Sequence, residues 1–151
     1  MDRYAINELV KWKDARRRKP LIIEGARQVG KTWLVKDFAC KHYDNIAYIN
    51  FEEQIYLRNL FETDFDVTRI ISAIGAAHQN CIPGKTLIFL DEIQEAPNGV
   101  TALKYFYENA SDYHIIAAGS LLGLELHRQA SFPVGKVQFM TLHPMSFLEF
   151  L

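Results

Sequence analysis

The sequence has few cysteines, and they form no metal-binding or disulfide pattern. Only Cys40 and Cys81 occur among its 151 residues, and no C-x-x-C spacing is present. Two widely separated cysteines signal neither a disulfide framework nor a zinc site. The five histidines show no i, i+4 pairing of the kind that places two metal ligands on one helix face. We therefore expect reduced thiols and no histidine-based metal centre.

Long hydrophobic runs are also missing. The longest strictly apolar stretches are short pieces such as residues 87–90, and the start, MDRYAINELV, carries an acidic residue at position 2. A transmembrane helix needs about 20 apolar residues, and a secretory signal needs an apolar region of its own. These patterns predict a cytoplasmic protein with no membrane partner.

Neither charge sign is in excess overall, but one segment is strongly basic. Lys plus Arg is 17 and Asp plus Glu is 18, so the net charge of -1 gives no general attraction to nucleic acid or anionic membranes. Residues 11–19, KWKDARRRK, nevertheless hold six basic residues and one acidic residue. Nucleic acid is one interpretation. A solvated helix end, where basic side chains are favoured, is the interpretation we prefer, so nucleic acid is an unsupported partner.

The composition and length fit one globular domain. Hydrophobic residues make up 49% and charged residues 23%, close to the averages for folded soluble domains. At about 150 residues per domain, the chain has room for one domain and not for two.

Apolar patterns with strand and helix periods alternate along the chain. The elements we expect are a helix ending near Lys19, a strand at 21–23, a helix at 31–43, a strand at 46–51, helical segments at 56–62 and 67–77 with Asp66 as N-cap, a strand at 86–90, a helix from Pro97 to about Ser111, and strands at 114–118 and 137–142. Alternation of this kind predicts an α/β fold with a mostly parallel sheet covered on both faces.

The segment between the first strand and the next helix carries the strongest motif. Residues 25–32 read GARQVGKT, a full match to G-x-x-x-x-G-K-[ST], in the strand-to-helix context that a phosphate-binding loop requires. Backbone N–H groups at a helix N-terminus bind anionic oxygens, and Gly30 lets the backbone approach them. Lys31 is expected to reach the β- and γ-phosphates and Thr32 to ligate Mg²⁺. The predicted nucleotide-binding residues are Gly25, Gln28, Val29, Gly30, Lys31, Thr32 and Trp33.

Two carboxylates follow the strand at residues 86–90. Asp91 and Glu92 stand at its carboxyl end, the edge where ligands bind in open α/β sheets. Asp91 fits the acidic residue that holds Mg²⁺ directly or through water. Glu92 can orient or deprotonate the attacking water. Together with the phosphate loop, this pair favours hydrolysis over binding alone.

Ser120 follows Gly119 at the end of the strand at 114–118. Its side chain could contact the γ-phosphate or the water, and a simple turn serine is an equally good interpretation. We include Ser120 with Glu92 and Lys31 among the candidate catalytic residues.

GARQVGKT, LIFLDEIQ and AAGSLLG together resemble the AAA-type P-loop ATPases of prokaryotes. Residues 132–151, FPVGKVQFMTLHPMSFLEFL, are similar to one uncharacterised family in which the ATPase core precedes a helical region and a C-terminal domain of unknown function. The resemblance implies a three-layer P-loop NTPase sandwich with sheet order 5-1-4-3-2. It also implies ATP and Mg²⁺ as cofactors and Ser120 at the sensor position.

The same resemblance bears on an arginine that would contact the phosphates. Many relatives have arginine where this chain has Lys136, and lysine lacks the bidentate fork, so we assign Lys136 no such role. Arg128 is the other candidate for contacting a phosphate, but we prefer to interpret it as a surface residue of a helix. In AAA-type enzymes a neighbouring subunit often supplies this arginine, so a homo-oligomer stays open.

The sequence therefore predicts an Mg²⁺-dependent ATPase core that couples hydrolysis to a conformational change. A nucleotide-gated binding module with little hydrolysis and a P-loop kinase are the alternatives. Ser146 and Glu149 form a capping box two residues before the end, so we expect the sequence to be the front part of a longer protein, cut inside its next helix. The expected layout is an N-terminal helix over 1–19, a nucleotide-binding core over 20–144 and the truncated helix over 145–151.

Overall fold

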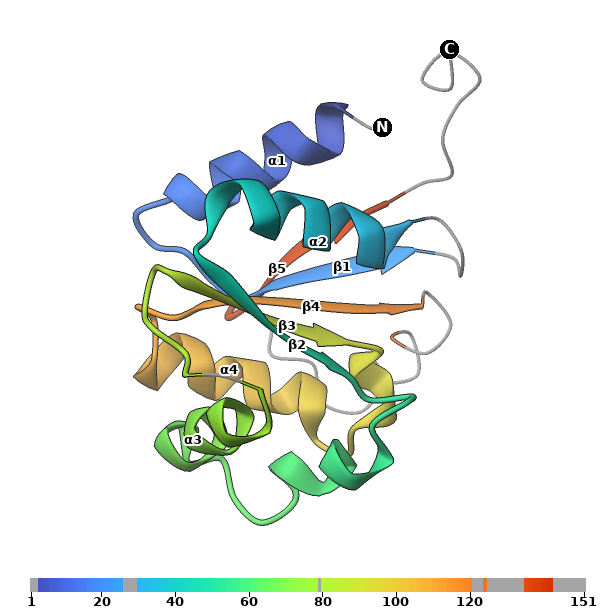
Figure 1. Cartoon of the computed structure of the whole chain (residues 1–151), viewed down its shortest axis with the longest axis vertical. Helices are drawn as coiled ribbons and strands as arrows, with labels where there is room; N and C mark the ends of the chain where they lie inside the picture. Colours follow the sequence, from blue (N-terminus) through green and yellow to red (C-terminus); the bar gives the residue numbers. More distant parts are fainter. Residues whose placement is uncertain (1–2, 26–29, 79, 121–123, 125–134, 143–151) are drawn as a thin grey trace.

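A computed structural model describes residues 3–25, 30–78, 80–120, 124 and 135–142 of the chain (Figure 1). Five parallel strands form one sheet in the order β2-β3-β4-β1-β5. Their bounds are Leu21–Gly25 for β1, Asn45–Asn50 for β2, Thr86–Asp91 for β3, His114–Ser120 for β4 and Gln138–Thr141 for β5. This is the predicted order 5-1-4-3-2 counted from the other edge, so the predicted α/β class and topology are confirmed.

Helices cover both faces of the sheet and complete three layers. Helices α1, Arg3–Asp14, and α2, Lys31–His42, lie on one face, and α3, Val67–Ala77, and α4, Gly99–Asn109, lie on the other (Figure 1). Neighbouring residues of a strand point to opposite faces. Leu21 and Ile23 accordingly pack in one apolar cluster with Phe38 of α2, whereas Ile22 packs in the other with Phe106 of α4. Burial on both faces explains why the inner strands β1, β3 and β4 read as continuous apolar runs.

The segments between the strands follow the predicted pattern with one change of helix type. Asp66 caps α3 as predicted, because its side chain accepts hydrogen bonds from the backbone N–H groups of Thr68 and Arg69. The helical segment predicted at 56–62 is a 3-10 helix, η1, Ile55–Phe61, and a second one, η2, Ile93–Glu95, follows β3.

In the described part of the chain, no helix combines the length and apolar character needed to cross a bilayer. Both cysteines are free.

The first helix is shorter than predicted. Helix α1 ends at Asp14 and not near Lys19. The buried Trp12 explains the early end, because its indole Nε1 donates a 2.6 Å hydrogen bond to the carbonyl of Lys19 and thereby requires the chain to turn back. Arg18 Nη1 also donates to the Lys13 carbonyl at 3.1 Å, which satisfies one of the last helical carbonyls. Residues 15–19 thus form a turn and not the last turn of a helix.

A buried histidine joins α1 and α2 to the start of β4. His114 is 7% exposed, its Nδ1 lies 2.6 Å from the Tyr43 hydroxyl, and its ring packs edge-on against Trp12. Burial, and then the positive charges of Arg18 and Lys13, lower the pKa of His114 to about 4. Burial raises the pKa of Tyr43, so the phenol keeps its proton and shares a hydrogen bond with the neutral imidazole.

This histidine should make the fold sensitive to acid. Below its ordinary pKa of 6.5 the unfolded chain binds a proton that the folded chain binds only near pH 4. The free energy of unfolding should therefore fall as the pH drops through this window, by up to about 3 kcal/mol. Urea unfolding at pH 7 and pH 5 measures the effect. His114→Phe keeps the ring packing and removes the titration, so a pH dependence unchanged by this substitution would contradict the expectation.

Candidate functional site

The carboxyl ends of β1, β3 and β4 meet at one edge of the sheet and bring the two sequence motifs together. Strand β4 lies between β1, which leads into the glycine-rich loop, and β3, which ends at Asp91. Gly25 and Ser120 are register partners at this edge. Parallel α/β sheets bind ligands at the carboxyl ends of their strands.

The described part of the glycine-rich loop presents the start of α2 to this edge. Gly25 is the last residue of β1, and Gly30 precedes α2 with a φ of +87°, a left-handed conformation that favours glycine. The first N–H groups of a helix, here at Lys31, Thr32 and Trp33, are not used by its own hydrogen bonds and can bind an anion. The predicted Gln28 and Val29 lie outside the described residues.

Lys31 is held inside the loop. Its side chain is 6% exposed, and Nζ donates a 3.0 Å hydrogen bond to the Gly25 carbonyl. Burying an ammonium group is unfavourable unless oxygen atoms surround it, and phosphate oxygens are among its best partners. Trp33, in contrast, is 56% exposed on the first turn of α2.

Thr32 and Asp91, which are far apart in the sequence, are in direct contact. Thr32 Oγ1 donates a 2.6 Å hydrogen bond to Asp91 Oδ2, and Asp91 is 2% exposed. A hydroxyl and a carboxylate oxygen are hard ligands of the kind that Mg²⁺ prefers, with phosphate oxygens and water completing its shell. Among the residues that the structure describes, no group of three or more His, Cys, Asp and Glu could hold a metal by itself. The donor set therefore fits a magnesium ion shared with a phosphate ligand.

Glu92 leaves the strand in a strained conformation. Its φ is +53°, which is uncommon for a residue with a side chain and turns the chain sharply after Asp91. Gln94 Nε2 donates a 2.6 Å hydrogen bond to Glu92 Oε2 and fixes the carboxylate. A Cβ at position 119 would lie 2.5 Å from Gln94 Oε1, so the glycine that precedes Ser120 makes room for Gln94.

Tyr48 and Gln94 are site residues that the sequence did not reveal. The Tyr48 hydroxyl donates a 2.8 Å hydrogen bond to Asp91 Oδ2, and the Lys36 Nζ lies 4.0 Å from the centre of its ring. Burial, followed by the hydrogen bond to Asp91, raises the pKa of Tyr48 and keeps its hydroxyl protonated as a donor. The one available signal was a polar tyrosine inside the apolar strand IAYINF.

Tyr48→Phe should weaken magnesium binding at Asp91 without unfolding the protein. The substitution keeps the ring and removes one of the hydrogen bonds that orient Asp91. Loss of such a supporting partner typically costs about 10- to 100-fold in metal affinity. We expect the Mg²⁺ concentration for half-maximal binding, measured by titration in the presence of nucleotide, to rise about tenfold. Tyr56→Phe, at an exposed position of η1, is the matched control, and equal Mg²⁺ dependence in both variants would show that Tyr48 does not support the site.

Lys136, to which we assigned no phosphate-contacting role, lies away from this edge. Lys136 Nζ lies 3.8 Å from Glu108 Oε1 and 5.4 Å from the centre of the Tyr107 ring, near the C-terminal end of α4. Because α4 runs back toward the amino ends of the strands, Lys136 lies at the opposite edge of the sheet. Arg128, Ser146 and Glu149 lie outside the described residues.

The sheet topology and the residues of the site together identify a P-loop nucleoside-triphosphatase fold. A glycine-bounded loop leads from β1 into α2, a buried lysine follows it, and a carboxylate on a nearby strand contacts the loop threonine.

The chain belongs to the AAA domain family, whose sequence profile matches residues 17–151. This match assigns the chain a nucleotide-binding, ATPase-like domain. No curated protein matches the chain.

Proposed function

We propose that this domain binds ATP together with Mg²⁺ and hydrolyses the bond between the β- and γ-phosphates. The contact between Thr32 and Asp91, next to a buried Lys31 and a terminal Glu92, carries this proposal. Lys31 and the N–H groups at the start of α2 would bind the phosphates. Thr32 and Asp91 would hold the cation, with Tyr48 orienting the carboxylate. Bound Mg²⁺ would neutralise charge on the phosphate oxygens.

Glu92 is the proposed general base. Its carboxylate would orient a water molecule and accept its proton while the water oxygen bonds to the γ-phosphorus. The bond from the γ-phosphorus to the bridging oxygen then breaks and leaves ADP. Because Gln94 already donates to Glu92 Oε2, Oε1 is the oxygen we assign to the water. Ser120, opposite Gly25 at the same edge, would contact the γ-phosphate or the water.

Release of inorganic phosphate from ATP by the purified chain tests the proposal. Magnesium-dependent phosphate release with ADP as the other product supports hydrolysis. ATP that is bound but not cleaved would instead identify a nucleotide-gated binding module. Cleavage only with an added acceptor that takes the phosphate would identify a kinase.

Coupling of hydrolysis to a conformational change is part of the same proposal and rests on the AAA-type family. The cytoplasmic location, the homo-oligomer that would supply an arginine, and the C-terminal domain that would follow this core stay predictions.

A further inference from the structure

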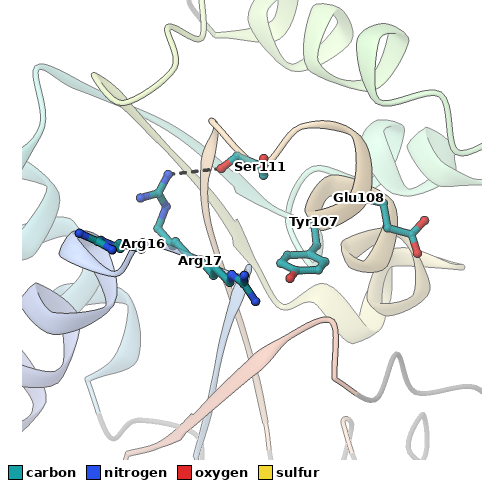
Figure 2. A pocket seen from close by; sticks show the side chains of 6 residues that line it. Arg16, Arg17, Tyr107, Glu108 and Ser111 are labelled. Carbon is teal, nitrogen blue, oxygen red and sulfur yellow. Dashed lines mark hydrogen bonds between the residues drawn. The ribbon is translucent and has the colours of Figure 1, made fainter.

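A pocket lies at the opposite edge of the sheet from the phosphate loop. It has a volume of about 400 Å³ and is lined by Arg16, Arg17, Arg18, Tyr107, Glu108 and Ser111 (Figure 2). These residues come from the turn before β1, the C-terminal end of α4 and the turn before β4. The pocket is thus at the amino ends of the strands. Its volume falls within the usual range of small-ligand sites.

Arg18 lines this pocket and is held in place by backbone carbonyls on two sides. Its guanidinium donates to the Lys13 carbonyl at 3.1 Å and to the Ser111 carbonyl at 3.3 Å, and it lies 6.0 Å from the centre of a Trp12 ring. Burial lowers the pKa of Arg18, yet an arginine keeps its charge at neutral pH. Arg18 therefore fixes the arginine-rich turn against the loop before β4.

Arg16 and Arg17 have no such structural task. Both side chains are exposed, and within the described residues neither makes a hydrogen bond or an ion pair. Helix α1 ends at Asp14, so the two arginines do not complete its last turn. The interpretation of this segment as a solvated helix end consequently accounts for Arg18 but leaves these two charges unexplained.

The residues that line the pocket carry a net positive charge. Glu108 is the single carboxylate among the described residues that line it, and Lys136 lies 3.8 Å from it. Asp112 acts on Arg18 from the neighbouring turn. Three guanidinium groups and one carboxylate thus line the pocket, with the Lys136 ammonium beside that carboxylate and the Asp112 carboxylate next to Ser111 in the chain.

The geometry points to single-stranded nucleic acid as the ligand of this pocket, with Arg16 and Arg17 on phosphates and Tyr107 under a base. The planar fork of arginine matches phosphate oxygens. Figure 2 shows Arg17 and Tyr107 on facing sides of the pocket. Aromatic rings beside a basic groove stack the unpaired bases of single strands. Two exposed arginines next to each other suit successive phosphates of a chain better than a single phosphate.

This inference is independent of the proposed hydrolysis. The pocket lies at the other edge of the sheet, and Arg16 precedes the part of the chain that the AAA domain profile matches. Lys31→Ala should therefore leave nucleic-acid binding unchanged. A loss of oligonucleotide binding in that variant would place the oligonucleotide at the phosphate loop and overturn the inference.

Fluorescence anisotropy with a labelled thymidine oligonucleotide of about 12 nucleotides tests the inference. We expect the parent to bind at about 50 mM salt and Arg16→Ala/Arg17→Ala to bind at least tenfold more weakly. The salt dependence of its affinity should also be shallower by about 1.4 logarithmic units per decade of salt, as expected for two lost phosphate contacts. Tyr107→Leu should lose about fivefold or more in affinity with an unchanged salt slope, because stacking and not charge is removed.

Lys41→Ala/Lys85→Ala is the matched control, because it removes two exposed positive charges at the same edge but outside the pocket. Its affinity should stay within about twofold of the parent, since rim charges elsewhere contribute little. Equal binding by the parent and the double-arginine variant, or no binding by the parent, would overturn the inference. Full displacement by millimolar inorganic phosphate would make free phosphate the ligand. Equal affinity for polyglutamate would make it an acidic peptide, and either result overturns the assignment to nucleic acid.

Discussion

Glu92→Gln is expected to reduce ATP hydrolysis by about 10²- to 10⁴-fold while ATP binding is retained. The substitution keeps the size of the side chain and replaces the carboxylate that would accept the proton of the attacking water. Binding depends on groups elsewhere at the site, above all Lys31 and the start of α2. The strained backbone at position 92 is unaltered, because both residues have the same backbone requirements.

Phosphate release and binding of a labelled ATP, measured on the same preparations, test this expectation. Glu95→Gln is the matched control, since it makes the same chemical change in η2, three residues further along the chain. The control should hydrolyse ATP at the rate of the parent. Equal turnover of the parent and Glu92→Gln would remove Glu92 from the mechanism.

Lys31→Ala should abolish measurable nucleotide binding, with a loss of affinity of about a hundredfold or more. Truncation of one partner of a buried, hydrogen-bonded charge pair costs about 2–5 kcal/mol. Lys31 is buried and directed into the loop by its hydrogen bond to Gly25, so its ammonium would meet the phosphates with little reorganisation. An exposed lysine could be replaced by water far more easily.

Titration with a fluorescent ATP analogue measures the loss. Lys41→Ala removes an exposed lysine from the far end of the same helix and should bind the analogue like the parent. Thermal unfolding of both variants shows that the fold is kept. An unchanged affinity in folded Lys31→Ala would refute the assignment of the phosphate loop.

The fold could be predicted because its signals are local and repeated. The three inner strands, β1, β3 and β4, are buried on both faces, so segments such as 86–90 stand out as short apolar runs. The loop at 25–32 combines a backbone need, the left-handed conformation of Gly30, with a chemical need, the ammonium of Lys31, and this combination is rare by chance. The order of the strands in the sheet was implied by the resemblance to AAA-type ATPases, because hydrophobic periodicity alone does not indicate which strands are neighbours.

The support around the site could not be predicted in the same way. Tyr48 and Gln94 act through contacts with Asp91 and Glu92 that depend on how β2, β3 and η2 are placed in space. A tyrosine in a strand is far more often a core residue than a partner of a carboxylate. The early end of α1 is likewise set by a bond from Trp12 to Lys19 across a turn. Helix periodicity carries no trace of that bond.

Glu92 is also the residue on which the proposed hydrolysis is tested most directly. Single-turnover phosphate release from a preformed complex of the protein with ATP and Mg²⁺ separates the chemical step from binding. The parent should release phosphate, and Glu92→Gln should hold the same amount of ATP and release phosphate at least about a hundredfold more slowly. Equal release by the two proteins, or no release by a parent that has bound ATP, would contradict the proposed ATPase mechanism.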